Sequence, residues 1–189
     1  KYGRGYRAFK ICNGFQALIK TGLVPYGEIR DPSEDMPTLT FNRINRHISR
    51  VVRTRMVSAT SPWALSKSVL ESRIHLVPVS HGEGRIVIDE DLARKLFVSG
   101  QVFTQYVDEN GIPSVTEPDN PNGSLYAIEG LTSPDGRVLG KMGHSERTMG
   151  NDADGSSVDL IKNIAGASAG NANESSCQNI FYAGVSYFN

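Results

Sequence analysis

The chain has 189 residues, enough for one domain with a buried core. Its 20 basic and 20 acidic residues give no net charge, which argues against a general nucleic-acid binder or a membrane-surface protein, because both usually carry excess positive charge. No apolar run approaches the ~20 residues of a membrane span, no signal-peptide pattern opens the chain, and its two cysteines do not form a disulfide framework. We therefore expect a soluble, cytoplasmic, mixed α/β domain with neither nucleic acid nor membrane as a partner.

The first third of the chain predicts a strand, a helix and further β structure. A short strand at residues 6–11 leads directly into Cys12. The helix that follows is indicated by apolar residues at helical spacing, namely Phe15, Leu18 and Ile19. Residues 23–36 are rich in turn-forming residues and are expected to be a connection, whereas residues 39–56 are rich in β-branched residues and read as β structure.

The rest of the chain alternates apolar runs with turn signals. Residues 74–79 predict a strand, which Pro78 would place at an end or edge because proline cannot donate to a ladder. The other expected elements are, in chain order, a glycine-broken loop at 80–85, a β run at 86–88, a helix at 89–100 with Asp89 as N-cap, a strand at 101–108, a hairpin of 127–131 and 137–142, and a closing helix at 180–188.

The organisation points to a single domain over residues 1–189. Residues 151–176 contain few bulky apolar side chains and are expected to be loosely ordered. A strand so close to the start of the sequence is typical of the middle of a sheet. We therefore expect this domain to be the C-terminal portion of a longer polypeptide, with the first strands of the sheet missing from the fragment.

Cys12 lies where a predicted strand passes into a predicted helix. A strand–Cys–x–Gly–helix turn lifts a nucleophile clear of the sheet, and Gly14 leaves room for it. The helix N-terminus is expected to lower the pKa of the thiol, and the backbone amide of Asn13 is placed to donate to an oxyanion. Most free cysteines are small buried hydrophobes, so this stretch alone leaves both interpretations open.

His144 follows a β run and has Glu146 two residues later. A histidine that takes a thiol proton with one nitrogen needs an acceptor to fix the other. Side chains at i and i+2 of an extended segment share a face, so Glu146 can reach His144. A lone His-x-Glu is equally typical of a solvated turn. Together with the cysteine turn it predicts a Cys–His–Glu set.

Other polar residues are candidates for the substrate pocket. Gln16 lies about one helical turn after Cys12 and either faces the site or is ordinary surface polarity. Ser80 and His81 are expected to line the pocket. His81 with Glu83 could be a second acid/base pair, but the neighbouring glycines favour a role in shaping the pocket or in contacting a partner portion. A cationic run either binds phosphate or an acidic partner surface, or is a solvated face; it consists of Arg43, Arg46, His47, Arg50, Arg53 and Arg55. No cluster has metal-ligand spacing.

Four segments occur in an order and spacing that resemble one family. They are Ile11-Cys12-Asn13-Gly14-Phe15-Gln16, His81-Gly82-Glu83-Gly84-Arg85, Asn120-Pro121-Asn122-Gly123-Ser124 and Gly143-His144-Ser145-Glu146-Arg147. Together they closely resemble the glutaminase region of phosphoribosylformylglycinamidine synthase, a class I glutamine amidotransferase. The stretches at 46–56, 61–65 and 178–188 look more like the large single-chain form of that enzyme than its small separate subunit.

The resemblance implies a flavodoxin-like α/β sheet with flanking helices, in which Cys12 attacks the side-chain amide of glutamine and forms a γ-glutamyl thioester. His144 would act as base and then acid, and Glu146 would orient it. The glutaminase portion would need no cofactor or metal. The released ammonia would pass to a synthetase portion, in the same or another chain, which uses ATP and Mg to convert formylglycinamide ribonucleotide to its amidine in purine biosynthesis. The whole enzyme is a ligase with glutamine as amido donor.

Two departures from the family pattern bear on activity. The family has glycine where this chain has Lys10, so the turn must open or Lys10 must point away. The family's first strands carry a glycine-rich loop that supplies an oxyanion donor, and these 189 residues do not include that loop. Losing one oxyanion donor costs roughly a hundredfold to a thousandfold in rate. We therefore expect these residues alone to be a poor glutaminase. The alternatives are a non-catalytic, truncated docking module and a different cysteine hydrolase on the same type of sheet.

Overall fold

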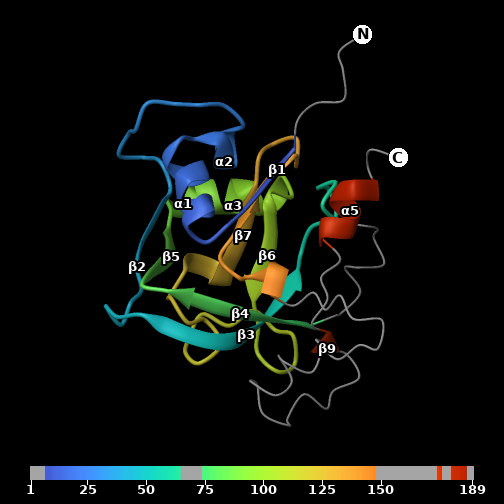
Figure 1. Cartoon of the computed structure of the whole chain (residues 1–189). Coiled ribbons are helices and arrows are strands. Elements are labelled where there is room, and N and C mark those ends of the chain that lie inside the picture. Colours follow the sequence, from blue (N-terminus) through green and yellow to red (C-terminus); the bar gives the residue numbers. More distant parts are fainter. Residues whose placement is uncertain (1–6, 65–73, 148–173, 176–179, 187–189) are drawn as a thin grey trace.

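A computed structural model describes residues 7–64, 74–147, 174–175 and 180–186. In this part of the chain, a seven-stranded sheet has the order β1-β8-β7-β6-β3-β4-β9, and β2 pairs with β5 in a two-stranded sheet (Figure 1). The strands are β1 (Ala8–Ile11), β2 (Thr38–Phe41), β3 (Ile48–Met56), β4 (Ile74–His81), β5 (Glu83–Val87), β6 (Val102–Tyr106), β7 (Ile128–Thr132), β8 (Val138–Lys141) and β9 (Glu174–Ser175). The helices are α1 (Asn13–Lys20), α2 (Leu23–Tyr26), α3 (Glu90–Val98) and α5 (Ile180–Ser186), with short 3₁₀ turns η2 (Leu125–Ala127) and η3 (Ser145–Arg147).

The fold is of the expected α/β class with flanking helices, and its sheet is mixed. β1 and β8 are parallel, with Ile11 opposite Lys141, whereas the pairings from β8 through β7, β6 and β3 to β4 are antiparallel. The predicted hairpin forms as β7 and β8. Because β1 and β8 run in the same direction, the residues that follow their carboxyl ends lie at one edge of the sheet.

Two expected connections contain regular structure. Residues 23–36 begin with α2, because Val24 and Pro25 are buried. Residues 80–85 are not a loop: His81 ends β4, and β5 begins at Glu83 after a bend at Gly82. One residue suffices for the bend, so the polar residues on either side of it pair as strands.

Pro78 lies inside β4 rather than at its end, opposite Val51 of β3. The pairing with β9 on the other side of β4 involves only Ile74 and His75, so the missing donor of Pro78 interrupts no ladder there. Of the segment expected to be loosely ordered, residues 151–173 and 176 lie outside the described part of the chain.

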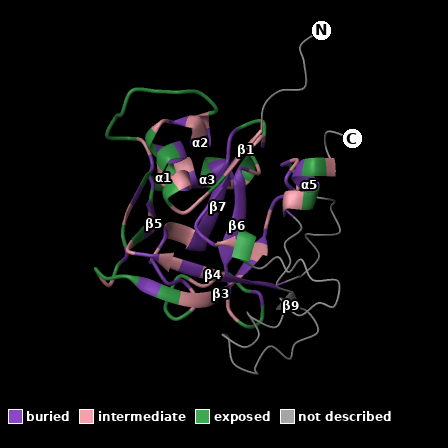
Figure 2. Cartoon of the chain, in the orientation of Figure 1, coloured by how far each residue is buried: buried purple, intermediate pink, exposed green. Residues whose placement is uncertain are grey.

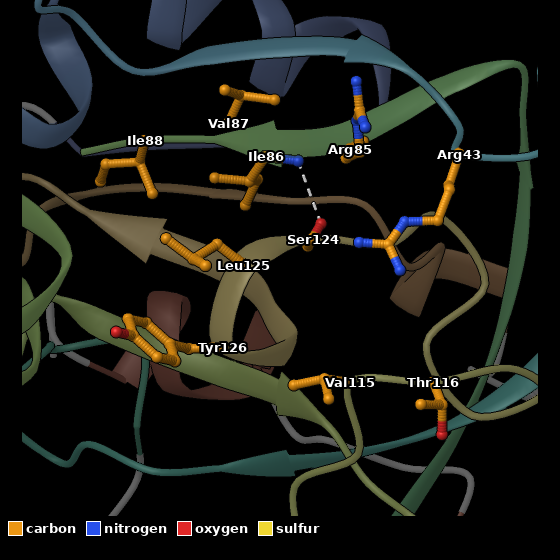
Figure 3. Close-up of a pocket in the computed structure, with 11 residues that line it drawn as sticks. Arg43, Arg85, Ile86, Val87, Ile88, Val115, Thr116, Ser124, Leu125 and Tyr126 are labelled. Carbon is orange, nitrogen blue, oxygen red and sulfur yellow. Dashed lines mark hydrogen bonds between the residues drawn. The ribbon is translucent and has the colours of Figure 1, made fainter. Parts of the chain in front are cut away.

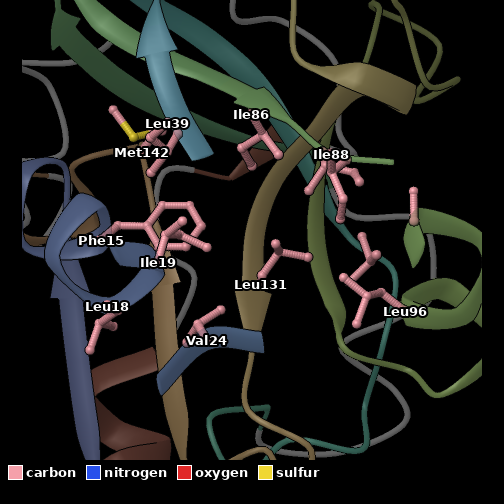
Figure 4. Close-up of a cluster of buried hydrophobic side chains, with 13 residues drawn as sticks. Phe15, Leu18, Ile19, Val24, Leu39, Ile86, Ile88, Leu96, Leu131 and Met142 are labelled. Atoms are coloured by element: carbon pink, nitrogen blue, oxygen red, sulfur yellow. The ribbon is translucent and has the colours of Figure 1, made fainter. Parts of the chain in front are cut away.

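The main core lies between the sheet and the helices α1, α2 and α3 (Figures 1 and 4). α1 buries Phe15, Leu18 and Ile19, the face predicted by their spacing. The ring of Phe15 lies directly on Gly140 of β8, where a Cβ atom would come within 2.0 Å of the ring. Buried residues predominate in β4, β6, β7 and β8, and exposed residues in the outer loops (Figure 2). The close contact of Phe15 with Gly140 packs α1 against the strand that leads to His144.

A smaller core surrounds Trp63, the only tryptophan. Its ring lies 5.6 Å from the ring of Phe9 in β1, and Phe9 lies 5.3 Å from Phe181 in α5. These contacts attach α5 beside β1. None of the described helices is long and apolar enough to cross a membrane.

Candidate active site

Cys12 occupies a sharp turn between β1 and α1. Its φ of 54° and ψ of −113° lie outside the conformations that a non-glycine residue usually adopts. The turn is held on both sides: the Cys12 amide donates to the Lys141 carbonyl at 3.0 Å, and the Gln16 amide donates to the Cys12 carbonyl at 3.1 Å. The strand–cysteine–helix arrangement expected from the sequence is present.

Lys10 does not open this turn. Its side chain is exposed and passes over Gly14, where an added Cβ atom would lie 2.9 Å from the Lys10 Cβ atom. The exposed Lys10 side chain is therefore accommodated beside the turn, and Gly14, which has no Cβ atom, supplies the space that it needs.

The Cys12 thiol is half-buried and lies 3.9 Å from the carbonyl oxygen of Ser80. Burial raises the pKa of the thiol; the Asn13 backbone amide and the charge of Arg147 oppose the increase, and the charge of Glu146 adds to it. The amide at the helix N-terminus lowers the pKa as expected, but desolvation outweighs it, so the expected net lowering of the thiol pKa is wrong. A reaction at this sulfur needs a base.

His144 and Glu146 are in direct contact, with His144 Nδ1 2.6 Å from Glu146 Oε1. A carboxylate accepts, so Nδ1 carries the proton and Nε2 is the basic nitrogen. Nε2 is buried, and no residue in the described part of the chain hydrogen-bonds to it. Glu146 therefore holds His144 in the tautomer that a general base for a thiol requires, with Nε2 unprotonated.

β4 contacts both halves of the candidate set. The carbonyl of Pro78 accepts from the His144 amide at 2.8 Å, and the carbonyl of Ser80, two residues later, faces the Cys12 sulfur. Since Cys12 follows β1 and His144 closely follows the adjacent strand β8, both lie at the same edge of the sheet. The charge of Glu146 also raises the pKa of the Cys12 thiol slightly.

A pocket of about 410 Å³ opens beside the thiol. Its lining includes the residues expected from the sequence, Gln16, Ser80 and His81, together with Asn13. Gln16 is oriented by a hydrogen bond from Nε2 to the Glu83 carbonyl at 3.0 Å. The pocket is thus wide enough for a small substrate beside Cys12.

Two further residues line the pocket, Phe41 and His47. Phe41 was not a candidate from the sequence, and His47 was expected only as a member of the cationic run. His47 Nε2 lies 3.1 Å from Ser80 Oγ. Both residues flank the turn between β2 and β3, and the pairing of Ile48 with His81 brings that turn to the pocket. No local pattern shows this, because it depends on strand register.

His81 shapes the pocket and does not exchange protons near neutral pH. The amide nitrogen of Asn42 donates to two carbonyls, so its Oδ1 accepts from His81 Nδ1 at 3.0 Å. Burial, with help from the charges of His47 and His144, lowers the pKa of His81 to about 4. Gly84 is needed beside it, because a Cβ atom there would lie 2.5 Å from the ring.

A fully buried ion pair, Glu129 of β7 and Lys141 of β8, lies under the His144 segment. Burial lowers the pKa of Lys141, and Glu129 opposes that change. The sequence analysis did not single these residues out, although a charged residue inside each strand of an apolar hairpin was an available signal.

A separate pocket of about 410 Å³ lies between β5 and η2, with Arg43 and Arg85 in its lining (Figure 3). Ser124 Oγ accepts from the Ile86 amide at its wall. It shares no lining residue with the Cys12 pocket. Within the described ranges no group of three or more His, Cys, Asp or Glu residues could hold a metal ion.

Comparisons with known proteins identify the family of the chain. Residues 5–188 match the family described as the CobB/CobQ-like glutamine amidotransferase domain. The chain is 36% identical to phosphoribosylformylglycinamidine synthase subunit PurQ of Salinibacter ruber over 145 residues, 77% of this chain and 55% of the relative. It is also 36% identical to the PurQ subunit of Synechocystis over 143 residues, 76% of this chain and 57% of that one.

The chain therefore spans a little over half the length of these relatives. Among solved structures, PurLQS from Thermotoga maritima shares the fold with a TM-score of 0.61 and 22% identity, over 96% of this chain and 61% of that chain. The family match covers nearly every residue, and this chain belongs to the CobB/CobQ-like glutamine amidotransferase domain family.

Proposed function

We propose that the chain is the glutaminase portion of a phosphoribosylformylglycinamidine synthase. The observation that carries the proposal is the strained turn at Cys12, which shares a sheet edge with a His144 whose Nδ1 is fixed by Glu146. The similarity to PurQ subunits supports the choice of glutamine as substrate.

In the proposed reaction the Cys12 sulfur attacks the side-chain carbonyl carbon of glutamine, while His144 Nε2 takes the thiol proton. The Asn13 amide donates to the carbonyl oxygen as it becomes negative. The protonated His144, stabilised by Glu146, gives its proton to the departing nitrogen, so ammonia leaves and a γ-glutamyl thioester remains. Water then attacks the thioester with His144 as base, which releases glutamate and restores the thiol.

The raised pKa of the Cys12 thiol fits this use of His144. A thiol that stays protonated at neutral pH is a weak nucleophile until a base removes its proton. The proton transfer then occurs during the attack, so the rate depends strongly on how His144 is placed.

The ammonia is proposed to pass to a synthetase portion that uses ATP and Mg. That portion forms the amidine of formylglycinamide ribonucleotide. The stretches at 46–56, 61–65 and 178–188 favour the large single-chain form, in which both portions belong to one polypeptide. The glutaminase portion itself is proposed to need no cofactor.

The test is covalent labelling with 6-diazo-5-oxo-norleucine, an electrophilic glutamine analogue, in the longest polypeptide that carries these residues. Peptide mass mapping is expected to place the label on Cys12. Cys12→Ala should abolish the label and His144→Ala should weaken it, because the sulfur then lacks its base. Label instead on Cys177, the second of the two cysteines in the sequence, would contradict the proposal. A chain that binds a synthetase but takes no label would favour a non-catalytic docking module.

A further inference from the structure

The buried pair Glu129–Lys141 lies where it can control the backbone around His144. Both side chains are 0% exposed, and Lys141 Nζ lies 3.5 Å from Glu129 Oε1. The second carboxylate oxygen of Glu129 accepts a hydrogen bond from the Thr104 hydroxyl. The carboxylate is therefore held from β6 and β8 at once.

The pair also holds the two residues on either side of His144. Glu129 Oε1 accepts from the Gly143 amide at 2.5 Å, and Lys141 Nζ donates to Ser145 Oγ at 2.8 Å. The His144 amide itself donates to the Pro78 carbonyl. Three successive residues are thus fixed from three strands, β7, β4 and β8, while the imidazole ring stays available for chemistry.

Gly143 makes this contact possible. A Cβ atom at this position would lie 2.9 Å from Glu129 Oε1 and 2.7 Å from the Val77 side chain. The glycine lets the carboxylate approach the peptide directly, so the pair acts on the segment that carries His144.

Energetics argue against a purely stabilising role. Burying two charges costs several kcal/mol per ion, and well-packed apolar residues of similar size are often as stable or more so. Such residues could fill the space between β7 and β8. They could not accept from the Gly143 amide or donate to Ser145.

We propose that Glu129 and Lys141 are positioning residues for His144, an inference that rests on the proposed function. They hold the 143–145 segment so that Nε2 is kept in the position from which it would take the proton of the Cys12 thiol. A misplacement of about 1 Å can cost on the order of a hundredfold in rate. Their role differs from that of Glu146, which fixes the tautomer and rotation of the ring.

A matched pair of variants tests this. E129Q/K141M and E129L/K141M both remove the two charges and keep similar volumes, but only the first keeps an oxygen that can accept from the Gly143 amide. In the longest polypeptide carrying the chain, E129L/K141M should have a kcat for glutamine hydrolysis at least about tenfold below that of E129Q/K141M, with KM within about twofold. Equal kcat values and equal pH profiles for the two variants would overturn the proposal.

Ser145→Ala decides the question if E129L/K141M does not fold. It removes the hydrogen bond from Lys141 Nζ to Ser145 Oγ while the ion pair with Glu129 remains. The expected result is a several-fold loss of kcat at unchanged KM, with a shift of the His144 imidazole NMR signals. Unchanged kcat together with unchanged signals would overturn the proposal.

The NMR signals also separate the two hypotheses. A wild-type chain that neither labels at Cys12 nor hydrolyses glutamine would refute the proposed function. The imidazole signals of His144 in Ser145→Ala would still show whether the pair positions the ring.

Discussion

Cys12 has a backbone φ of 54°, a value that residues other than glycine rarely adopt. Conformations of this kind cost about 1–3 kcal/mol and persist where the surroundings enforce them. Here the enforcing contacts are hydrogen bonds of the Cys12 amide and carbonyl to Lys141 and Gln16. The strain is the cost of presenting the sulfur to the pocket.

We predict that Cys12→Gly is more stable than Cys12→Ala by about 1 kcal/mol, because glycine relieves the strain and alanine does not. Both variants lack the sulfur, so the comparison isolates the backbone. Urea unfolding of the two variants measures it. A Cys12→Ala protein as stable as Cys12→Gly would show that the turn is not strained.

His81 should make the fold sensitive to acid. Its pKa is about 4 in the folded chain and near 6.5 when unfolded, so the unfolded state binds more protons between these values. Stability therefore rises with pH across this window and is lost as pH falls from about 6.5 towards 4, by at most about 3 kcal/mol.

The check for His81 is the difference in unfolding free energy between wild type and His81→Gln, measured from pH 4 to 7. The variant cannot titrate at this position. The wild type should lose stability relative to the variant as the pH falls. A difference that stays constant over the whole range would contradict the lowered pKa of His81.

At single residues, the candidates predicted from the sequence are those whose signal is local. Cys12 with Gly14, and His144 with Glu146, stand close together along the chain, so their patterns could be read directly. The sign of the Cys12 pKa shift was not accessible, because it depends on burial. His47 reaches the pocket only through the pairing of β3 with β4, which no local pattern encodes.

Among the elements, the close packing of α1 on β8 sets the relative position of the segments that carry Cys12 and His144. Phe15 lies on Gly140, two residues before the strand gives way to the His144 segment. Only the Phe15 ring therefore separates the helix that follows Cys12 from the backbone of the strand that precedes His144.

Gly140→Ala is expected to destabilise the chain by about 3 kcal/mol, because its Cβ atom would overlap the Phe15 ring. Gly82→Ala is the matched control, since nothing lies within 4 Å of the added atom. Guanidinium unfolding compares the two. Phe15→Leu in the Gly140→Ala background should recover part of the loss; equal stability of the two alanine variants would contradict the contact.

The helices and strands were predicted correctly where the spacing of apolar residues was regular. The prediction failed where a single residue, Gly82, makes the bend between two strands. The α3 helix begins as expected, with the Asp89 side chain accepting from the amides of Asp91 and Leu92. The supposed loop at 80–85 became two strands, because Gly82 alone makes the bend. Polar residues in that stretch concealed the pairing of β5 with β2.

For the whole molecule, α5 joins residues that are far apart in sequence. Gly184 packs on Trp63, and the Arg7 guanidinium lies 5.7 Å from the centre of the same ring. The aromatic cluster thus connects β1, the segment around Trp63 and α5. Disrupting it should lower the free energy of unfolding of the whole domain.

Gly184→Ala tests this connection. Alanine favours a helix by about 1 kcal/mol over glycine, but its Cβ atom would lie 2.5 Å from the Trp63 ring. We expect a net loss of stability of about 1 kcal/mol and a red shift of tryptophan emission, since Trp63 is the only emitter of its kind. Val185→Ala, at an exposed position, is the control; a blue shift or a gain in stability for Gly184→Ala would contradict the packing.

The alignment of Ile11 with Lys141 has a consequence for any redesign of this scaffold. Sliding one of these parallel strands by two positions keeps the inward and outward faces but carries its end about 7 Å along the ladder. Sulfur and imidazole would then be out of range of each other in a protein that still looked folded. Spectroscopic evidence of a native sheet would consequently say little about catalytic activity. A single distance measured between the carboxyl ends of these two strands would show whether the sulfur and the imidazole can still react.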